Sequence, residues 1–156
     1  MGEVTNEQAN LMLRLYEDRR ESRLREAREW FSANFHVKNE DDVARLCPPG
    51  SREHASMRMV LTYWEMVASI VNRGLIDQEF FFENSGEQWG VWEQVKPVLS
   101  VWRARFGSPK FVANLETHCE RLEIWRERQN PGSNAALRKV FALMQEASSA
   151  SKAQAA

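Results

Sequence analysis

Hydrophobic side chains recur every three or four residues along most of the chain, the spacing that places them on one face of a helix. The clearest run follows Ser51, a residue type that favours helix N-caps. Its apolar positions alternate at spacings of four and three: Met57, Leu61, Trp64, Ala68, Val71 and Leu75. Similar runs predict helices over about 86–106, over about 109–128 and from Ser133 onward. Because no segment alternates polar and apolar residues with a period of two, the pattern indicates an all-α fold.

One long helix is predicted at the start of the chain, from about Asn6 to Phe35. Thr5 and Gln8 have the spacing of a capping box at its beginning. The apolar stripe is thin for a helix of this length and consists of Leu13, Tyr16, Leu24, Ala27 and Phe31. A thin stripe suits a helix that pairs with another helix, so Leu13 and Tyr16 are candidate contacts for self-association.

Prolines, glycines and capping residues divide the rest of the chain. The segment Cys47-Pro48-Pro49-Gly50 ends a short helix over Glu40–Leu46, since two successive prolines remove backbone donors. Gly74 ends the helix that follows Ser51, and Asp77 begins a short helix through Phe82. Further caps are predicted at Ser85, Ser108 and Ser133.

These elements predict an antiparallel helical bundle of four to five main helices, with short extra helices and a long N-terminal helix. We expect a single helical domain over 1–146. The last residues, 147–156, contain Ala, Ser, Lys and Gln alone, which predicts a flexible C-terminal tail.

The charge balance argues against nucleic-acid binding. Lys and Arg together number 21 and Asp and Glu together 22, so the formal net charge is −1 and no basic excess attracts phosphates. Six arginines crowd the first predicted helix, but acidic residues intervene, which favours a solvated helix face. Binding to an anionic surface stays open for these arginines: Arg14, Arg19, Arg20, Arg23, Arg25 and Arg28.

Several features predict a cytoplasmic protein. No run approaches the roughly 20 apolar residues of a membrane span. The first residues lack the basic start and apolar run of a secretory signal. Cys47 and Cys119 have neither a metal-ligand spacing nor a disulfide framework, so we interpret them as free buried thiols in a reducing compartment.

The sequence carries few of the patterns that enzymes use. His36, His54 and His118 belong to no Glu-x-x-His or His-Glu-x-x-His pattern. His118 lies beside Cys119, but neighbouring helix residues point about 100° apart, which favours a structural role over a metal or catalytic one. Neither a glycine-rich phosphate loop nor a Gly-x-Ser-x-Gly elbow is found. We therefore assign no catalytic, metal-binding or cofactor-binding residue, expect no cofactor, and do not expect enzymatic activity.

Phe80, Phe81 and Phe82 are the most unusual apolar sequence. Three successive helical positions cover about 200° of a helix, which is more than one buried face. Trp89 follows shortly afterwards. The four rings fit either a corner where several helices meet or an apolar interaction patch for a second chain.

Part of the chain carries a recognisable set of residues. They are Tyr63-Trp64-Glu65, Val67, Asn72-Arg73-Gly74-Leu75-Ile76-Asp77, Trp92, Pro97 and Arg103. Over about residues 57–105 the sequence resembles a family of uncharacterised bacterial helical domains, a domain of unknown function. The resemblance implies a helical fold and supplies no reaction and no cofactor. The residues themselves make Glu65 and Arg103 candidates for a buried polar pair between neighbouring helices.

We therefore expect a non-enzymatic helical binding or assembly module. It either self-associates as a homo-oligomer, in the simplest case a dimer, or binds a protein partner. The contact would be an apolar patch near Phe80–Trp92 or along the first helix. The alternative is a small-ligand or metal-binding bundle, with or without enzymatic activity, in which polar groups converge on one enclosed cavity. Those groups would be Tyr63, Glu65, Arg103 and His118.

Overall fold

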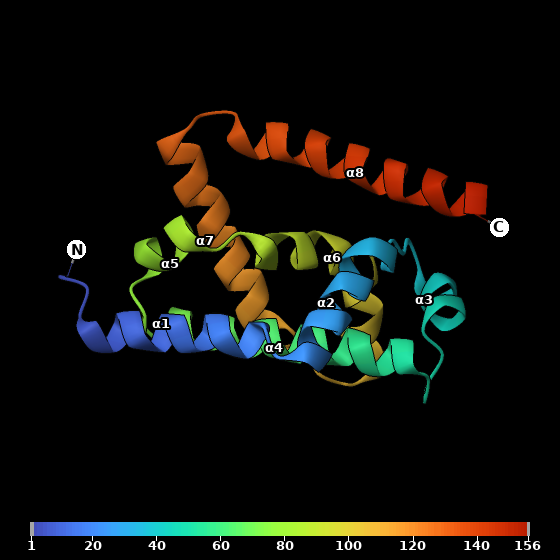
Figure 1. Ribbon diagram of the computed structural model, residues 1–156, viewed down its shortest axis with the longest axis horizontal. Helices are drawn as coiled ribbons and strands as arrows, with labels where there is room; N and C mark the ends of the chain where they lie inside the picture. The colour runs from blue at the N-terminus through green and yellow to red at the C-terminus, as the bar shows by residue number, and fades with distance from the viewer. Residues whose placement is uncertain (1, 156) are drawn as a thin grey trace.

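A computed structural model of the protein describes residues 2–155, which form eight helices and no strand (Figure 1). The all-α prediction is therefore confirmed for these residues. The helices are α1 (Asn6–Arg19), α2 (Ser22–Asn34), α3 (Glu40–Leu46), α4 (Arg52–Asn72), α5 (Gln78–Asn84), α6 (Glu87–Arg105), α7 (Ala113–Gln129) and α8 (Ser133–Ala155).

Helix α4 is the centre of the fold. It makes the most extensive contacts between helices, with α2 and with α7. In Figure 1 α4 runs opposite to α1 and α6, and α7 crosses them. The seam predicted from the sequence supplies much of its buried face, which consists of Ser56, Met57, Val60, Leu61, Tyr63, Trp64, Val67, Ala68 and Val71. The strongest periodic signal in the sequence thus belongs to the helix around which the others pack.

The core is rich in aromatic rings. The rings of Phe31 and Phe35 stack with their centroids 4.6 Å apart, and Phe35 lies 6.4 Å from Trp102. Trp64 is 2% exposed, and Trp92 and Trp102 are also buried. Large rings of this kind bury much apolar area in a chain of modest length.

The predicted long N-terminal helix is wrong, because the chain breaks between α1 and α2. The carboxylate of Glu21 accepts hydrogen bonds from the backbone N–H groups of Arg23 (3.0 Å) and Leu24 (2.9 Å), so this residue caps a new helix. The break changes the direction of the chain, so that α2 packs on α4. The Leu15 carbonyl oxygen of α1 accepts a hydrogen bond from the Tyr63 hydroxyl (2.6 Å). Two short helices can each follow the core where one straight helix could not.

Other helix ends differ from the sequence prediction as well. The helix predicted from about 109 begins at Ala113, after Val112, whose φ is +59°. The Ser85 hydroxyl donates to the Gln88 side-chain oxygen, and the Gln88 amide nitrogen donates to the Ser85 carbonyl oxygen. Gly86 is the residue before α6, and no side chain caps this helix. Of the segment 147–156, expected to be a flexible tail, residues 147–155 form the last turns of α8, and residue 156 lies outside the described residues.

Candidate functional site

The predicted pair between Glu65 and Arg103 does not form, and both side chains bind the start of α7 instead. The Glu65 carboxylate accepts from the backbone N–H groups of Asn114 (3.0 Å) and Leu115 (2.8 Å) and from the Asn114 side chain (2.8 Å). The Arg103 guanidinium donates to the Phe111 carbonyl oxygen (3.0 Å) and to the Glu116 carboxylate (2.6 Å). The charged groups of both residues therefore have hydrogen-bond partners at the start of α7.

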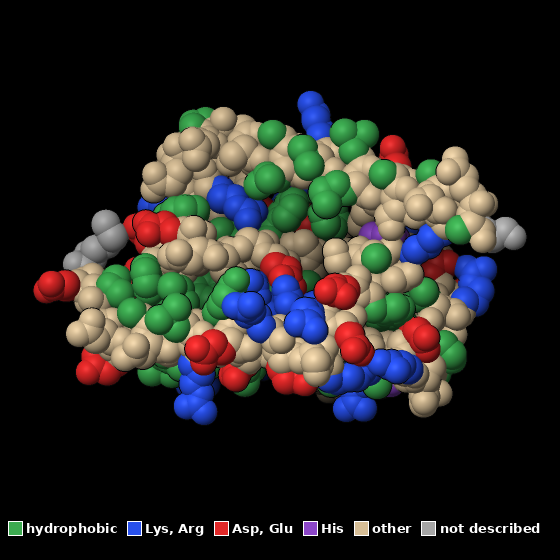
Figure 2. All heavy atoms as spheres, viewed as in Figure 1, with side chains coloured by type: hydrophobic (Ala, Val, Ile, Leu, Met, Phe, Trp, Pro, Cys, Tyr) green, Lys and Arg blue, Asp and Glu red, His purple; other side chains and the backbone are tan. Residues whose placement is uncertain are grey.

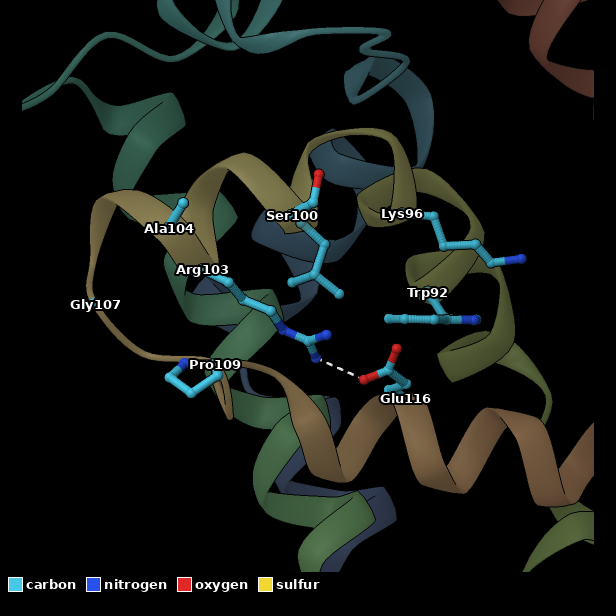
Figure 3. A pocket seen from close by; sticks show the side chains of 9 residues that line it. Trp92, Lys96, Ser100, Arg103, Ala104, Gly107, Pro109 and Glu116 are labelled. Atoms are coloured by element: carbon cyan, nitrogen blue, oxygen red, sulfur yellow. Dashed lines mark hydrogen bonds and ion pairs between the residues drawn. The ribbon is translucent and has the colours of Figure 1, made fainter.

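Arg103 lies in an open hollow of about 760 Å³ between α6 and the start of α7 (Figure 3). Figure 3 shows the Arg103 side chain reaching across this hollow to Glu116, with Trp92 and Lys96 at the other end. Lys96 forms an ion pair with Glu93. Both cationic groups of the hollow thus have partners within the chain, which makes it a poor site for an anionic ligand.

Most of the predicted patch Phe80–Phe82 and Trp89 is buried. Phe81 and Phe82 are 3% and 5% exposed, and Phe80 is partly buried against the core. The rings of Phe81 and Phe82 lie edge-on to His118, with centroids 5.4 Å and 5.1 Å away. The rings thus form a corner where helices meet, and the interpretation as an exposed interaction patch is wrong for Phe81, Phe82 and Trp89.

Trp89 holds α8 against the body of the molecule. Its indole N–H donates to the Glu123 carboxylate (2.7 Å), and its ring lies 5.7 Å from the Phe141 ring of α8. Arg138 of α8 forms an ion pair with the same Glu123 carboxylate. A residue predicted for an intermolecular contact therefore makes an intramolecular one.

Leu13 and Tyr16 are 57% and 50% exposed, as a self-association contact requires. They line a groove of about 240 Å³ between α1, α4 and α5. Of the six first-helix arginines, Arg19 and Arg28 form ion pairs with Glu87, and Arg23 donates to Ser56 (3.2 Å). Half of the predicted cationic cluster is thus engaged within the fold, and Figure 2 shows basic and acidic side chains interspersed over this face.

The polar residues of the ligand-binding alternative do not meet in one cavity. Tyr63 lines the groove beside α1, Arg103 the hollow of Figure 3, and Glu65 a third concavity. His118 is buried in the core, where its Nε2 lies 3.3 Å from the Gln88 amide nitrogen. Burial raises the pKa of Tyr63 to about 12, as expected for a structural phenol.

The third concavity is an apolar groove of about 600 Å³, here called the α3–α4–α6 groove. Val43, Met57, Leu61, Trp102 and Phe111 are among the apolar residues that line it. Charged groups stand at its edge, where Arg105 forms an ion pair with Glu40. Its size and lining resemble those of small-molecule sites, which commonly enclose about 300–1,000 Å³ of mainly apolar space.

Both cysteine thiols are buried, and burial favours their neutral form. Cys47 and Cys119 are free and buried, as predicted, and burial raises the pKa of Cys47 to about 11. Burial also raises the pKa of Cys119. Within residues 2–155, no group of three or more His, Cys, Asp or Glu residues is placed to hold a metal ion. Thiols held in the neutral form in this way are poor nucleophiles.

Burial gives His118 a defined effect on stability. Removal from water, together with the nearby charge of Arg121, lowers its pKa from 6.5 to about 4. The unfolded chain therefore binds a proton between pH 6.5 and 4 that the folded chain does not, so the free energy of unfolding falls as the pH falls through this window. We expect His118 to remove roughly 3 kcal/mol between pH 7 and pH 4.

Urea unfolding of the wild type and of His118→Asn at several pH values measures this effect. The variant has no titrating imidazole at this position, so its stability should fall less steeply below pH 6.5. The other titratable groups, including His36, are the same in both proteins. Their contributions to the free energy of unfolding therefore cancel when the two proteins are compared. Equal pH slopes for the two proteins would show that His118 is protonated as readily in the fold as in water.

Helix α8 carries an apolar surface that the sequence analysis did not single out. Its alternating spacing of four and three is that of a heptad seam, formed by Ala136, Val140, Leu143, Ala147 and Ala150. All five residues are exposed. Leu137 and Met144, 38% and 64% exposed, flank one side of this α8 seam. Figure 2 shows hydrophobic side chains gathered along this helix. The signal was present in the sequence, within a stretch whose alanines resembled a flexible tail.

Another side of α8 holds it to the molecule. The Asn134 side chain donates to the Glu123 carbonyl oxygen (2.8 Å), and Ser148 and Lys152 donate to the Ala33 carbonyl oxygen (2.9 Å and 2.7 Å). Phe141 contributes the contact with Trp89. At about 100° per residue, the α8 seam lies about 145° around the helix from these contacts. The helix is therefore fixed in place with its seam uncovered.

Comparison with known families accounts for most of the chain. A family model described as "Domain of unknown function (DUF4760)" matches residues 4–122. The chain belongs to this family. The DUF4760 match extends well beyond the 57–105 region of the resemblance seen in the sequence, from α1 into α7. Helix α8 and its seam lie outside the matched residues.

No curated protein and no solved structure matches the chain. Within residues 2–155 of this DUF4760 member, no helix is both long enough and apolar enough to cross a membrane.

Proposed function

We propose that the protein is a non-enzymatic assembly module that associates with a second copy of itself through the α8 seam. The observation that supports this proposal is the row of uncovered apolar side chains on a helix already fixed to the body. Leu143 and Met144 are each 64% exposed and Val140 is 52% exposed. Uncovered apolar surface of this kind is characteristic of interaction sites.

Self-association is a better account of the seam than packing within the chain. The side of α8 that faces the body is occupied by Asn134, Phe141 and Ser148, each of which has a partner there. A heptad seam is buried only when another helix with a matching seam lies against it. A second copy of the chain itself supplies a helix with the matching seam, so no other protein is needed. Symmetric pairing of two copies is the commonest form of oligomer.

Substitution of Leu143 by glutamate tests the proposal. We expect the wild type to be a dimer by sedimentation equilibrium at micromolar concentrations. Leu143→Glu should raise the dissociation constant of the dimer at least about tenfold, because a charge at the seam must be desolvated. Ile124→Glu is the matched control, since Ile124 is 60% exposed on α7 and lies away from the seam. It should leave the dimer intact.

Two results would contradict the proposal. A wild type that stays monomeric through the micromolar range excludes self-association, and capture of a different protein by the seam would then be the remaining role. A Leu143→Glu variant that dimerises like the wild type places the contact elsewhere, with Leu13 and Tyr16 on α1 as the next surface to substitute.

A second function is favoured by one specific observation, the α3–α4–α6 groove. Its volume of about 600 Å³ and its aromatic side chains, Trp102, Phe106 and Phe111, suit an apolar small molecule. Native mass spectrometry separates the two functions in one measurement, because it reports stoichiometry and retained ligands together. A monomer that carries an additional small mass favours the groove, and a dimer of the bare chain mass favours the α8 seam.

We also propose that the protein works in the bacterial cytoplasm. Support comes from the free, buried state of both cysteines, which a reducing compartment maintains, and from the resemblance to bacterial helical domains.

A further inference from the structure

We infer that two copies pair α8 against α8 in antiparallel orientation, in one register that the charges beside the seam select. This inference rests on the proposed function and specifies its geometry. The two-fold axis passes between Val140 and Leu143, so that Val140 of each copy packs on Leu143 of the other. Such an interface is isologous, and every contact occurs twice.

The seam residues match in this register. Antiparallel helices meet in layers, and the layer next to Val140–Leu143 brings Ala136 of one copy against Ala147 of the other. Small alanines at both ends let the two backbones approach closely, while the larger side chains fill the middle. Leu137 and Met144, which flank the seam on one side, meet each other across the same pair of helices.

Charged residues on the other flank distinguish this register from its neighbours. Lys139 and Glu146 are both exposed and lie seven residues apart on one edge of the seam. In the proposed register, Lys139 of each copy faces Glu146 of the other. A slip of one heptad in one direction places Glu146 opposite Glu146, and a slip in the other direction places Lys139 opposite Lys139. Each slip replaces two attractive pairs with a like-charge contact, which opposes it.

The same charges oppose parallel pairing. In parallel coiled coils the two flanks of the seam face each other, so Lys139 would lie beside the apolar Met144 of the other copy. Only the antiparallel arrangement places the charged edges of the two copies, with Lys139 and Glu146, against each other. It also places the apolar edges, with Leu137 and Met144, against each other. Lys139 and Glu146 take no part in the ion pairs formed within residues 2–155, which leaves both available across the interface.

Two single charge reversals, studied alone and mixed, test the register. In Lys139→Glu both facing positions become acidic, and in Glu146→Lys both become basic, so each variant alone should dimerise roughly tenfold more weakly than the wild type. A mixture of the two variants restores both opposite-charge pairs, and the heterodimer should form about as tightly as the wild-type dimer. Sedimentation equilibrium or native mass spectrometry of the mixture measures this recovery.

The double variant Lys139→Glu, Glu146→Lys is the matched control. It exchanges the charges without changing their complementarity, so it should dimerise as the wild type does. Charge reversals at exposed helix positions leave the core untouched, and circular dichroism confirms that each variant is folded.

The outcomes separate this inference from the proposed function. A monomeric wild type overturns both. A wild-type dimer that Leu143→Glu dissociates, but whose charge variants show no weakening alone or no recovery when mixed, overturns the antiparallel register and leaves self-association through the α8 seam standing.

Discussion

Replacement of Phe31 with alanine is expected to lower the free energy of unfolding by about 4 kcal/mol, the range found for phenylalanines removed from a packed core. The side chain is 1% exposed, and its ring stacks on Phe35 at 4.6 Å. The substitution removes the transfer free energy of the ring and leaves a cavity between α2 and its neighbours. It also removes the stacking with Phe35, which adds about 1 kcal/mol to burial alone.

Urea unfolding followed by far-ultraviolet circular dichroism measures this loss. Phe106→Ala is the control of the same chemistry, because Phe106 is 55% exposed; its truncation loses mainly the edge-to-face contact with Phe111 (5.2 Å) and should cost about 1 kcal/mol. Phe31→Leu keeps most of the volume and should fall between the two. Similar losses for Phe31→Ala and Phe106→Ala would mean that α2 is not packed in the core as described.

Replacement of Glu65 with alanine is expected to cost about 2 kcal/mol, which is large for a side chain that is not fully buried. Its carboxylate binds three donors at the start of α7, including the backbone N–H groups of Asn114 and Leu115. Val112, which precedes the helix, provides no side-chain cap. Without Glu65 these donors lose a charged acceptor that also interacts favourably with the helix dipole.

Two further variants sharpen the test. Glu65→Gln keeps one carbonyl acceptor without the charge, so it should lose about half as much stability as Glu65→Ala. Glu83→Ala removes a glutamate that is exposed on α5, and it should change stability by less than about 0.5 kcal/mol. The capping role is refuted if Glu65→Ala unfolds at the same urea concentration as Glu83→Ala.

The sequence predicted helices best where local signals were complete. Ser51 and Asp77 were each expected to cap a helix, and each side chain accepts a backbone N–H at the start of the predicted helix. Capping of this kind involves residues two or three positions apart, so the information is local. The break at Glu21 was missed because no glycine or proline marks it, and a glutamate is an uncommon cap. Tertiary packing of α2 on α4 decided that position.

The candidate sites were harder to predict because they depend on partners distant in the chain. Phe81 and Phe82 are buried by His118, more than thirty positions away, and Trp89 by Phe141. Glu65 and Arg103 were expected to pair with each other, but each binds at the start of α7 instead. The α8 seam could have been found from spacing alone, if its alanines had been treated as close-packing positions.

Side chains from distant helices complete several helix ends in this molecule. Glu65 binds the N-terminal turn of α7, fifty positions along the chain, and Gln94 of α6 donates to the Phe35 carbonyl oxygen (3.0 Å) just after α2. A polypeptide that is still emerging from the ribosome can therefore form its helices locally, but it cannot form the hydrogen bonds with distant side chains that complete their ends. The start of α7 can form its last hydrogen bonds only after α4 has docked beside it, so those turns order late, together with the tertiary structure.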